Sequence, residues 1–137
     1  MKVLLDTNAY SALMRGRSEV AERVRKAEHV LMSTIVVGEL MFGFRNGTQF
    51  QQNIDLLESF LANRYVTIVP VTLTTADRFG RIAASLRTKG RPIPTNDIWI
   101  AAHTLETGAD LLSYDEHFSV VDGLTWIPLL PQSVNSG

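Results

Sequence analysis

The chain has 137 residues, enough for one domain with its own core, and 45% of them are hydrophobic against 20% charged. It contains no cysteine, which excludes a disulfide framework, thiolate-bound zinc and thiol catalysis. The formal net charge of −1 argues against a general polyanion binder, so a nucleic-acid partner would need local basic patches. No apolar run is long enough to span a membrane, and Met1 and Lys2 lead into a strand rather than a signal peptide. We therefore expect a cytoplasmic protein without a membrane partner.

Short, wholly apolar stretches alternate with helical patterns along the chain. Such stretches are typical of strands covered on both faces, whereas apolar residues at three- and four-residue steps indicate amphipathic helices. The expected strands are residues 3–5, 30–32, 66–71, 111–113 and 125–127. The expected helices are about 7–14, 19–28, 35–44, 49–63, 72–89 and 95–107. This alternation predicts a three-layer α/β/α domain with a central, mostly parallel sheet of about five short strands.

The expected helix at 35–44 is apolar on nearly every side, which predicts that it is buried. Its only acidic residue is Glu39. No repeat or internal boundary interrupts the chain, so we expect one domain over residues 1–130. Residues 131–137 are expected to form a disordered tail.

Four acidic residues differ from the others because each adjoins an apolar run that should belong to the core. They are Asp6, Glu39, Asp97 and Asp115. Parallel strands place their C-terminal ends, and the starts of the helices that follow, at one edge of the sheet, where Asp6, Glu39 and Asp115 fall. Asp97 joins them if the loop at 90–96 returns to that edge. Seven extended residues span roughly 23 Å, which is enough.

Each of these acids has an ordinary structural explanation when it is taken alone. Asp6 can cap a helix, Asp97 can interact with a helix dipole, and a turn can require Asp115. Glu39 can pair with an arginine. Together, however, four carboxylates near a core repel one another unless their charge is compensated. Without cysteine or a histidine cluster, the expected compensating group is a hard divalent cation with oxygen ligands, Mg²⁺ or Mn²⁺.

Four sequence blocks resemble the PIN domain family, and within it the VapC-type toxins of bacterial toxin–antitoxin pairs. The blocks are LLDTN at 4–8, STIVVGELMFG at 33–43, PTNDIWIAAH at 94–103 and LLSYDEHF at 111–118. They cover nearly the whole chain in the family's order and approximate spacing. The resemblance implies that the four acids are the catalytic and metal-binding quartet. It also implies polar residues that orient them, which here are Thr7, Asn8 and Ser113, the last in place of the threonine of many relatives.

What the resemblance implies is an endoribonuclease that depends on Mg²⁺ or Mn²⁺ and acts as the toxin of a type II (VapBC) pair. It further implies a homodimer and a cognate VapB-type antitoxin whose C-terminal segment lies across the active site. Basic residues near the active edge are the candidates for contacts with RNA, because loops there more often carry function. These candidates are Arg15, Arg17, Lys89 and Arg91.

Two histidines lie close to the acids in the sequence. We interpret His103 as structural, because it is one and a half helical turns beyond Asp97 and should point elsewhere. His117 is two residues beyond Asp115, where a proton shuttle is conceivable. The preferred interpretation is a loop histidine that packs beside Phe118.

Three alternatives to the toxin remain. A PIN-domain ribonuclease of RNA maturation or decay would carry the same four acids. A catalytically silent PIN-like binding module would lose one or more of them, and all four are present. A receiver-like signalling module would need adjacent acids after the first strand and a lysine after the last, and the sequence has neither.

Overall fold

The sheet is the centre of the fold in the computed structural model, which describes residues 1–130, so the expected tail at 131–137 lies outside the described residues. The strands pair in the order β3-β2-β1-β4-β5, and every pairing is parallel. The predicted parallel sheet is therefore confirmed. The strands are β1 (Lys2–Leu5), β2 (His29–Ser33), β3 (Val66–Val69), β4 (Asp110–Ser113) and β5 (Trp126–Pro128).

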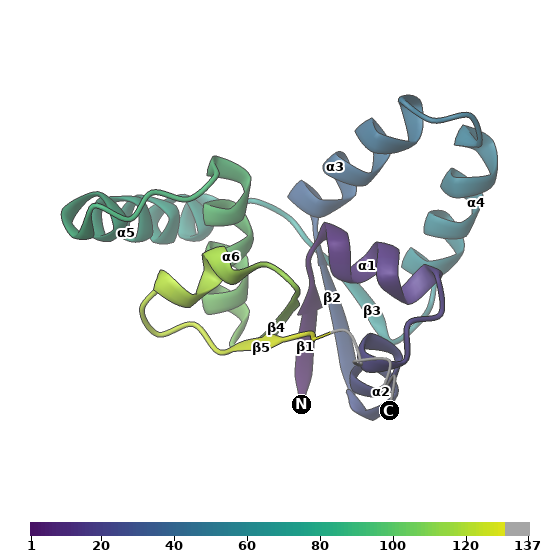
Figure 1. Ribbon diagram of the computed structural model, residues 1–137, viewed down its shortest axis with the longest axis horizontal. Coiled ribbons are helices and arrows are strands. Elements are labelled where there is room, and N and C mark those ends of the chain that lie inside the picture. The colour runs from purple at the N-terminus through teal and green to yellow at the C-terminus, as the bar shows by residue number, and fades with distance from the viewer. Residues whose placement is uncertain (131–137) are drawn as a thin grey trace, which may run out of the picture.

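Helices flank this sheet, with α5 and α6 at one end of the molecule and α3 and α4 at the other (Figure 1). All of them fall within a few residues of the predicted positions, and the α/β architecture is confirmed. A 3₁₀ turn, η1, was not predicted. No helix within residues 1–130 is long and apolar enough to cross a membrane. The helical elements are α1 (Thr7–Met14), α2 (Ser18–Lys26), α3 (Thr34–Arg45), α4 (Phe50–Leu61), α5 (Leu73–Lys89), α6 (Thr95–Thr107) and η1 (Glu116–Val120).

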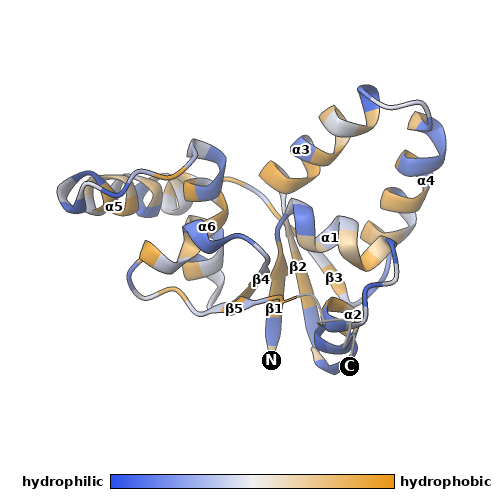
Figure 2. Cartoon of the chain, in the orientation of Figure 1, coloured by the Kyte–Doolittle hydropathy of each residue, from blue (hydrophilic) through white to orange (hydrophobic). Residues whose placement is uncertain are grey.

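The central strands have no solvent-facing side. Val3, Leu4 and Leu5 of β1 are all fully buried, as are Leu111 and Leu112 of β4. The strands are accordingly hydrophobic over most of their length in Figure 2. Burial of both faces explains why these strands are apolar without alternation.

The strand order reverses direction between β1 and β4. From β1 the chain adds β2 and then β3 on one side, and only afterwards places β4 and β5 on the other. In open parallel sheets, the helices on the two sides of such a switch point diverge and leave a crevice at the C-terminal ends of the strands. Asp6 follows β1 directly, and Ser113 ends β4, so both residues lie at the switch point of the sheet.

Helix α3 is not buried, so that prediction is wrong. Only Val36 and Leu40 are buried within it, whereas Met41 is 39% and Phe42 69% exposed. Its inner side packs against α1, α4, α6 and β2, whereas Gly38, Met41, Phe42 and Arg45 are exposed. The apolar outer side of α3 is therefore surface in the single chain.

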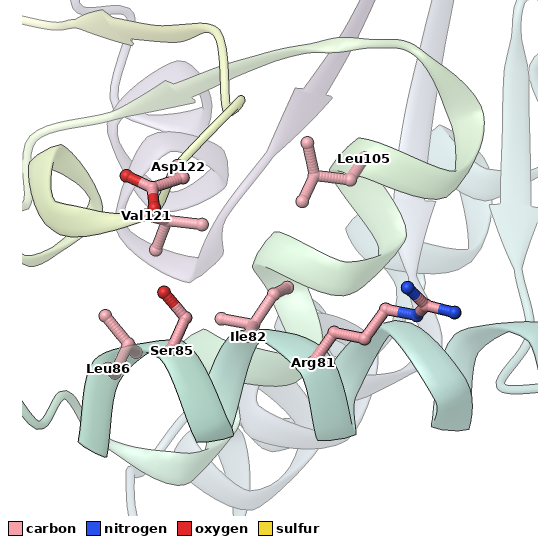
Figure 3. Close-up of a pocket in the computed structure, with 7 residues that line it drawn as sticks. All are labelled: Arg81, Ile82, Ser85, Leu86, Leu105, Val121 and Asp122. Carbon is pink, nitrogen blue, oxygen red and sulfur yellow. The ribbon is translucent and has the colours of Figure 1, made fainter. Parts of the chain in front are cut away.

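A cavity of about 260 Å³ separates α5 from the segment that follows η1 (Figure 3). None of the four acids lines it. At the C-terminal end of α5, the Lys89 ammonium donates to the Val120 carbonyl (3.0 Å) and to Asp122 (2.6 Å), which fixes η1 against this helix. The cavity is lined by Arg81, Ile82, Ser85, Leu86, Leu105, Val121 and Asp122.

Candidate active site

Asp6 is the buried member of the acidic group, with 5% of its surface exposed. It is the N-cap of α1, where its Oδ1 accepts from the Ala9 amide (2.8 Å), while its Oδ2 accepts from the Ser113 hydroxyl (2.5 Å). Burial raises the pKa of Asp6 to about 6; the two hydrogen bonds oppose this, and the nearby charges of Asp97 and Asp115 add to it. A negative charge at this position is therefore costly without a cation.

Glu39 is held by two side chains from other helices. The Thr7 hydroxyl of α1 donates to its Oε1 (2.5 Å), and the Asn96 amide of α6 donates to its Oε2 (3.1 Å). Both carboxylate oxygens are thus oriented, and α1, α3 and α6 are connected at one point. The one acidic side chain of the apolar helix α3 is thus held by polar side chains of its neighbours.

Asp97, Asp115 and His117 form a compact group at the starts of α6 and η1. Ligand atoms from all three lie within 4.8 Å of one another. Nδ1 of His117 is 3.0 Å from Oδ2 of Asp115 and 3.3 Å from Oδ2 of Asp97. Burial is the main cause of a raised pKa at Asp97; His117 opposes it, and the charges of Asp115 and Glu39 reinforce it.

The structure thus brings the four predicted acids together at one edge. Asp97 lies within electrostatic range of the other three, since it raises the pKa of Asp6 and its own pKa is raised by Asp115 and Glu39. Of the predicted orienting residues, Thr7 contacts Glu39 and Ser113 contacts Asp6. Ser113 also accepts from the Asp115 amide (2.9 Å) and so connects two of the acids.

The contacts of His117 differ from those expected from the sequence, and the contact of Asn96 with Glu39 was not predicted. The ring of His117, expected in a loop, lies against Asp97 and Asp115, because η1 begins directly after Asp115 and turns the chain back. Asn96 was not singled out, although it directly precedes Asp97, and its position in the first turn of α6 was the available signal. His103 is structural as expected: it is buried, and its ring contacts Ser33 and the Pro70 carbonyl.

The four basic candidates lie in different surroundings. Arg17 pairs with Glu19 (3.4 Å), and Lys89 is held by Asp122 as described above. Arg15 lines a cavity of about 220 Å³ between α1, α3 and α4. Arg91 is exposed and lines a cavity of about 370 Å³ that is also lined by His117.

The comparisons with known proteins agree with this geometry. The model of the PIN domain family matches residues 3–124. The chain belongs to the PIN domain family. It is 32% identical to Ribonuclease VapC1 of Haemophilus influenzae over 131 residues, which cover 92% of this chain and 96% of that protein. It is also 25% identical to the tRNA(fMet)-specific endonuclease VapC of Shigella flexneri, over 90% of this chain and 95% of that one.

Solved structures show the same fold. VapBC-1 from nontypeable Haemophilus influenzae superposes with a TM-score of 0.83 at 30% identity, covering 94% of this chain and 98% of that chain. VapBC2 from Rickettsia felis, bound to a DNA fragment from its promoter, also superposes with a TM-score of 0.83. The two are 24% identical, and the match covers 93% of this chain and 98% of that chain. Within the PIN family, the chain is therefore a VapC toxin ribonuclease of the VapBC toxin–antitoxin systems.

The donor set of the site suits a metal ion. Carboxylate oxygens predominate, and oxygen ligands suit hard divalent cations. Burial raises the pKa of Asp6 although the Ser113 hydroxyl and the Ala9 amide donate to it, so these two donors offset its buried charge only in part. The acidic group is consistent with a metal site.

Proposed function

We propose that Asp6, Glu39, Asp97 and Asp115 are the catalytic residues of this ribonuclease and hold Mg²⁺ or Mn²⁺. The observation that carries this proposal is the convergence of four carboxylates at the switch point of a parallel sheet, with one of them nearly buried. When bound, the ion supplies activation of water and neutralisation of charge on the attacked phosphodiester.

The protein's own residues orient the acids and exclude water from one of them. Ser113 fixes the carboxylate of Asp6 from the neighbouring strand, and Thr7 fixes that of Glu39 from α1. Such supports matter because a ligand held in one orientation loses no freedom when the ion or substrate arrives. His117, between Asp97 and Asp115, keeps these two carboxylates close together.

The partners follow from the relatives. The neighbours of known structure are toxin–antitoxin complexes, so a VapB-type antitoxin is the proposed inhibitor. We propose a homodimer as well, supported by the exposed apolar residues Met41 and Phe42 on the outer side of α3. We propose transfer RNA as the first substrate to test, because the Shigella flexneri relative is named for tRNA(fMet).

The direct test compares Asp97→Asn with Glu58→Gln, an exposed acid of α4 outside the site. We expect the purified wild type to cleave RNA in Mg²⁺ or Mn²⁺, to stop with a chelator and to recover when the ion is added back. Asp97→Asn should lose cleavage with an unchanged circular dichroism spectrum, and Glu58→Gln should keep it. Cleavage by a folded Asp97→Asn variant would contradict the assignment.

A cellular experiment separates a toxin from a ribonuclease of RNA maturation or decay. Induced wild-type protein should arrest growth, and co-expression of the neighbouring antitoxin gene should restore it. Sequencing of RNA ends after induction maps the cut site. Growth that is unaffected by an active enzyme would favour the maturation or decay role.

A further inference from the structure

A cavity next to the acidic group is a second functional feature of the same edge. It has a volume of about 370 Å³, at the lower end of the roughly 300–1,000 Å³ of ligand pockets. The loop that joins α5 to α6 forms one wall through Arg91 and Ile93, and η1 forms the other. His117 lines the cavity and also contacts Asp97 and Asp115, so the cavity opens beside the position of the reaction.

Charge also distinguishes this cavity. RNA is a polyanion, and four carboxylates repel it except where a cation intervenes. Arg91 is exposed, and no carboxylate within residues 1–130 lies within ion-pair distance of its guanidinium. Lys89, two residues away, is held by Asp122, which leaves Arg91 as the cation available at this wall. The exposed carboxylate of Glu116 also lines the cavity and limits how much negative charge enters it.

We propose that this cavity binds the nucleotide that adjoins the scissile phosphate of the RNA. Arg91 contacts the phosphate of that nucleotide, and its base lies against the apolar side chains of Ile93 and Val120. A phosphate contact by arginine gives affinity and position, whereas contacts to the base give a preference at one position of the RNA sequence. The inference rests on the proposed ribonuclease activity and adds the determinant of which RNA position is read.

The first test uses a short labelled RNA that spans the cut site mapped for the wild type. Arg91→Ala should raise KM about five- to tenfold without changing kcat, because it removes a contact made equally in the ground state and the transition state. The slope of log KM against log salt should fall by about 0.7, the value for one phosphate of a single strand. The matched control is Arg23→Ala, an exposed arginine of α2 near the opposite edge of the sheet (Figure 1); it should change neither quantity.

A second test locates the base. The same RNA is made with one nucleotide beside the cut lacking its base, and the position at which this raises KM for the wild type is identified. Ser119→Tyr, which fills the cavity from an exposed position, should remove that penalty, as long as its circular dichroism spectrum matches the wild type. A penalty that persists in the folded variant would contradict the cavity as the base site.

The outcomes separate the two proposals. A wild type that cleaves no RNA in Mg²⁺ or Mn²⁺ overturns the proposed function and this inference with it. A wild type that cleaves RNA, with Arg91→Ala indistinguishable from Arg23→Ala in KM and salt slope, overturns the nucleotide site alone.

Discussion

The site has two halves that differ in their exposure to solvent. The buried half, Asp6 and Ser113, lies at the ends of adjacent central strands and is shielded from solvent. The rim half, Asp97, Asp115 and His117, lies on the first turns of α6 and η1, where the side chain of His117 is 50% exposed. The sheet holds a costly charge in a fixed place, and the rim leaves its carboxylates accessible to substrate. Rigid support at one side and access at the other are the division expected of a catalytic site.

The largest effect should come from Asp6→Asn, which removes the charge of the buried half. Cleavage should fall by at least about a thousandfold, since an acid of the catalytic group is lost. In chelator at pH 7, the same variant should unfold at a higher temperature than the wild type, because a poorly compensated buried charge is gone. Parallel measurements of cleavage and thermal unfolding check both parts. A variant that is inactive and less stable would point to a structural role for Asp6.

Ser113→Ala should have the next largest effect. It leaves Asp6 without its neighbouring-strand donor and the Asp115 amide without its acceptor. Changes at residues that orient metal ligands commonly cost 10–100-fold, and we expect about that loss in cleavage. Ser113→Thr keeps the hydroxyl and should retain most of the activity. Equal losses in the two variants would mean that packing, and not the hydroxyl, is what matters.

The pH dependence of stability should distinguish the buried half in the metal-free protein. The pKa of Asp6 is raised from 3.8 to about 6, so its folded form binds a proton more readily than its unfolded form. Its contribution to stability is therefore present at acid pH and is lost as pH rises from about 4 to about 6, by up to about 3 kcal/mol.

His103 acts in the opposite direction, because burial lowers its pKa and so favours its neutral form in the fold. Its contribution is lost as pH falls below the unfolded value near 6.5. For that reason the measurement is the difference in unfolding free energy between wild type and Asp6→Asn in chelator, which should shrink as pH falls from 6 to 4. A difference that does not vary with pH would contradict the raised pKa.

The smallest effect should come from Asn96→Ala at the edge of the rim half. Asn96 is exposed, and the carboxylate of Glu39 also accepts a hydrogen bond from Thr7, which remains when Asn96 is replaced. Loss of an exposed hydrogen bond to a charged group should reduce cleavage about threefold to tenfold. Asn96→Gln, with the same amide on a longer chain, is the control for loss of the amide. If Asn96→Ala reduced cleavage as much as Ser113→Ala does, the support of the rim half would matter as much as that of the buried half, contrary to this prediction.

The proximity of the four acids could be predicted from the sequence, because each adjoins an apolar run and parallel strands bring such ends together. The residues that contact these acids are harder to predict from the sequence. His117 joins the rim only because η1 reverses the chain, and a five-residue 3₁₀ turn has no periodic pattern of its own. Asn96 meets Glu39 through the crossing of α3 and α6, which are 57 residues apart at this contact.

The incorrect prediction for α3 has a similar cause. The spacing of apolar residues shows which sides of a helix are apolar. It does not show whether the surface that covers them belongs to the same chain or to a partner. Met41 and Phe42 are apolar and exposed here, so the pattern that predicted burial fits a surface that a partner covers.

We propose that the buried half and the rim half form one cation site. Isothermal titration of Mn²⁺ into the wild type, Asp6→Asn, Asp97→Asn and Glu58→Gln tests it without any RNA. We predict that the wild type and Glu58→Gln bind the ion with the same affinity, while Asp6→Asn and Asp97→Asn each lose at least about tenfold, or 1.4 kcal/mol. Binding to either site variant with wild-type affinity would contradict the account.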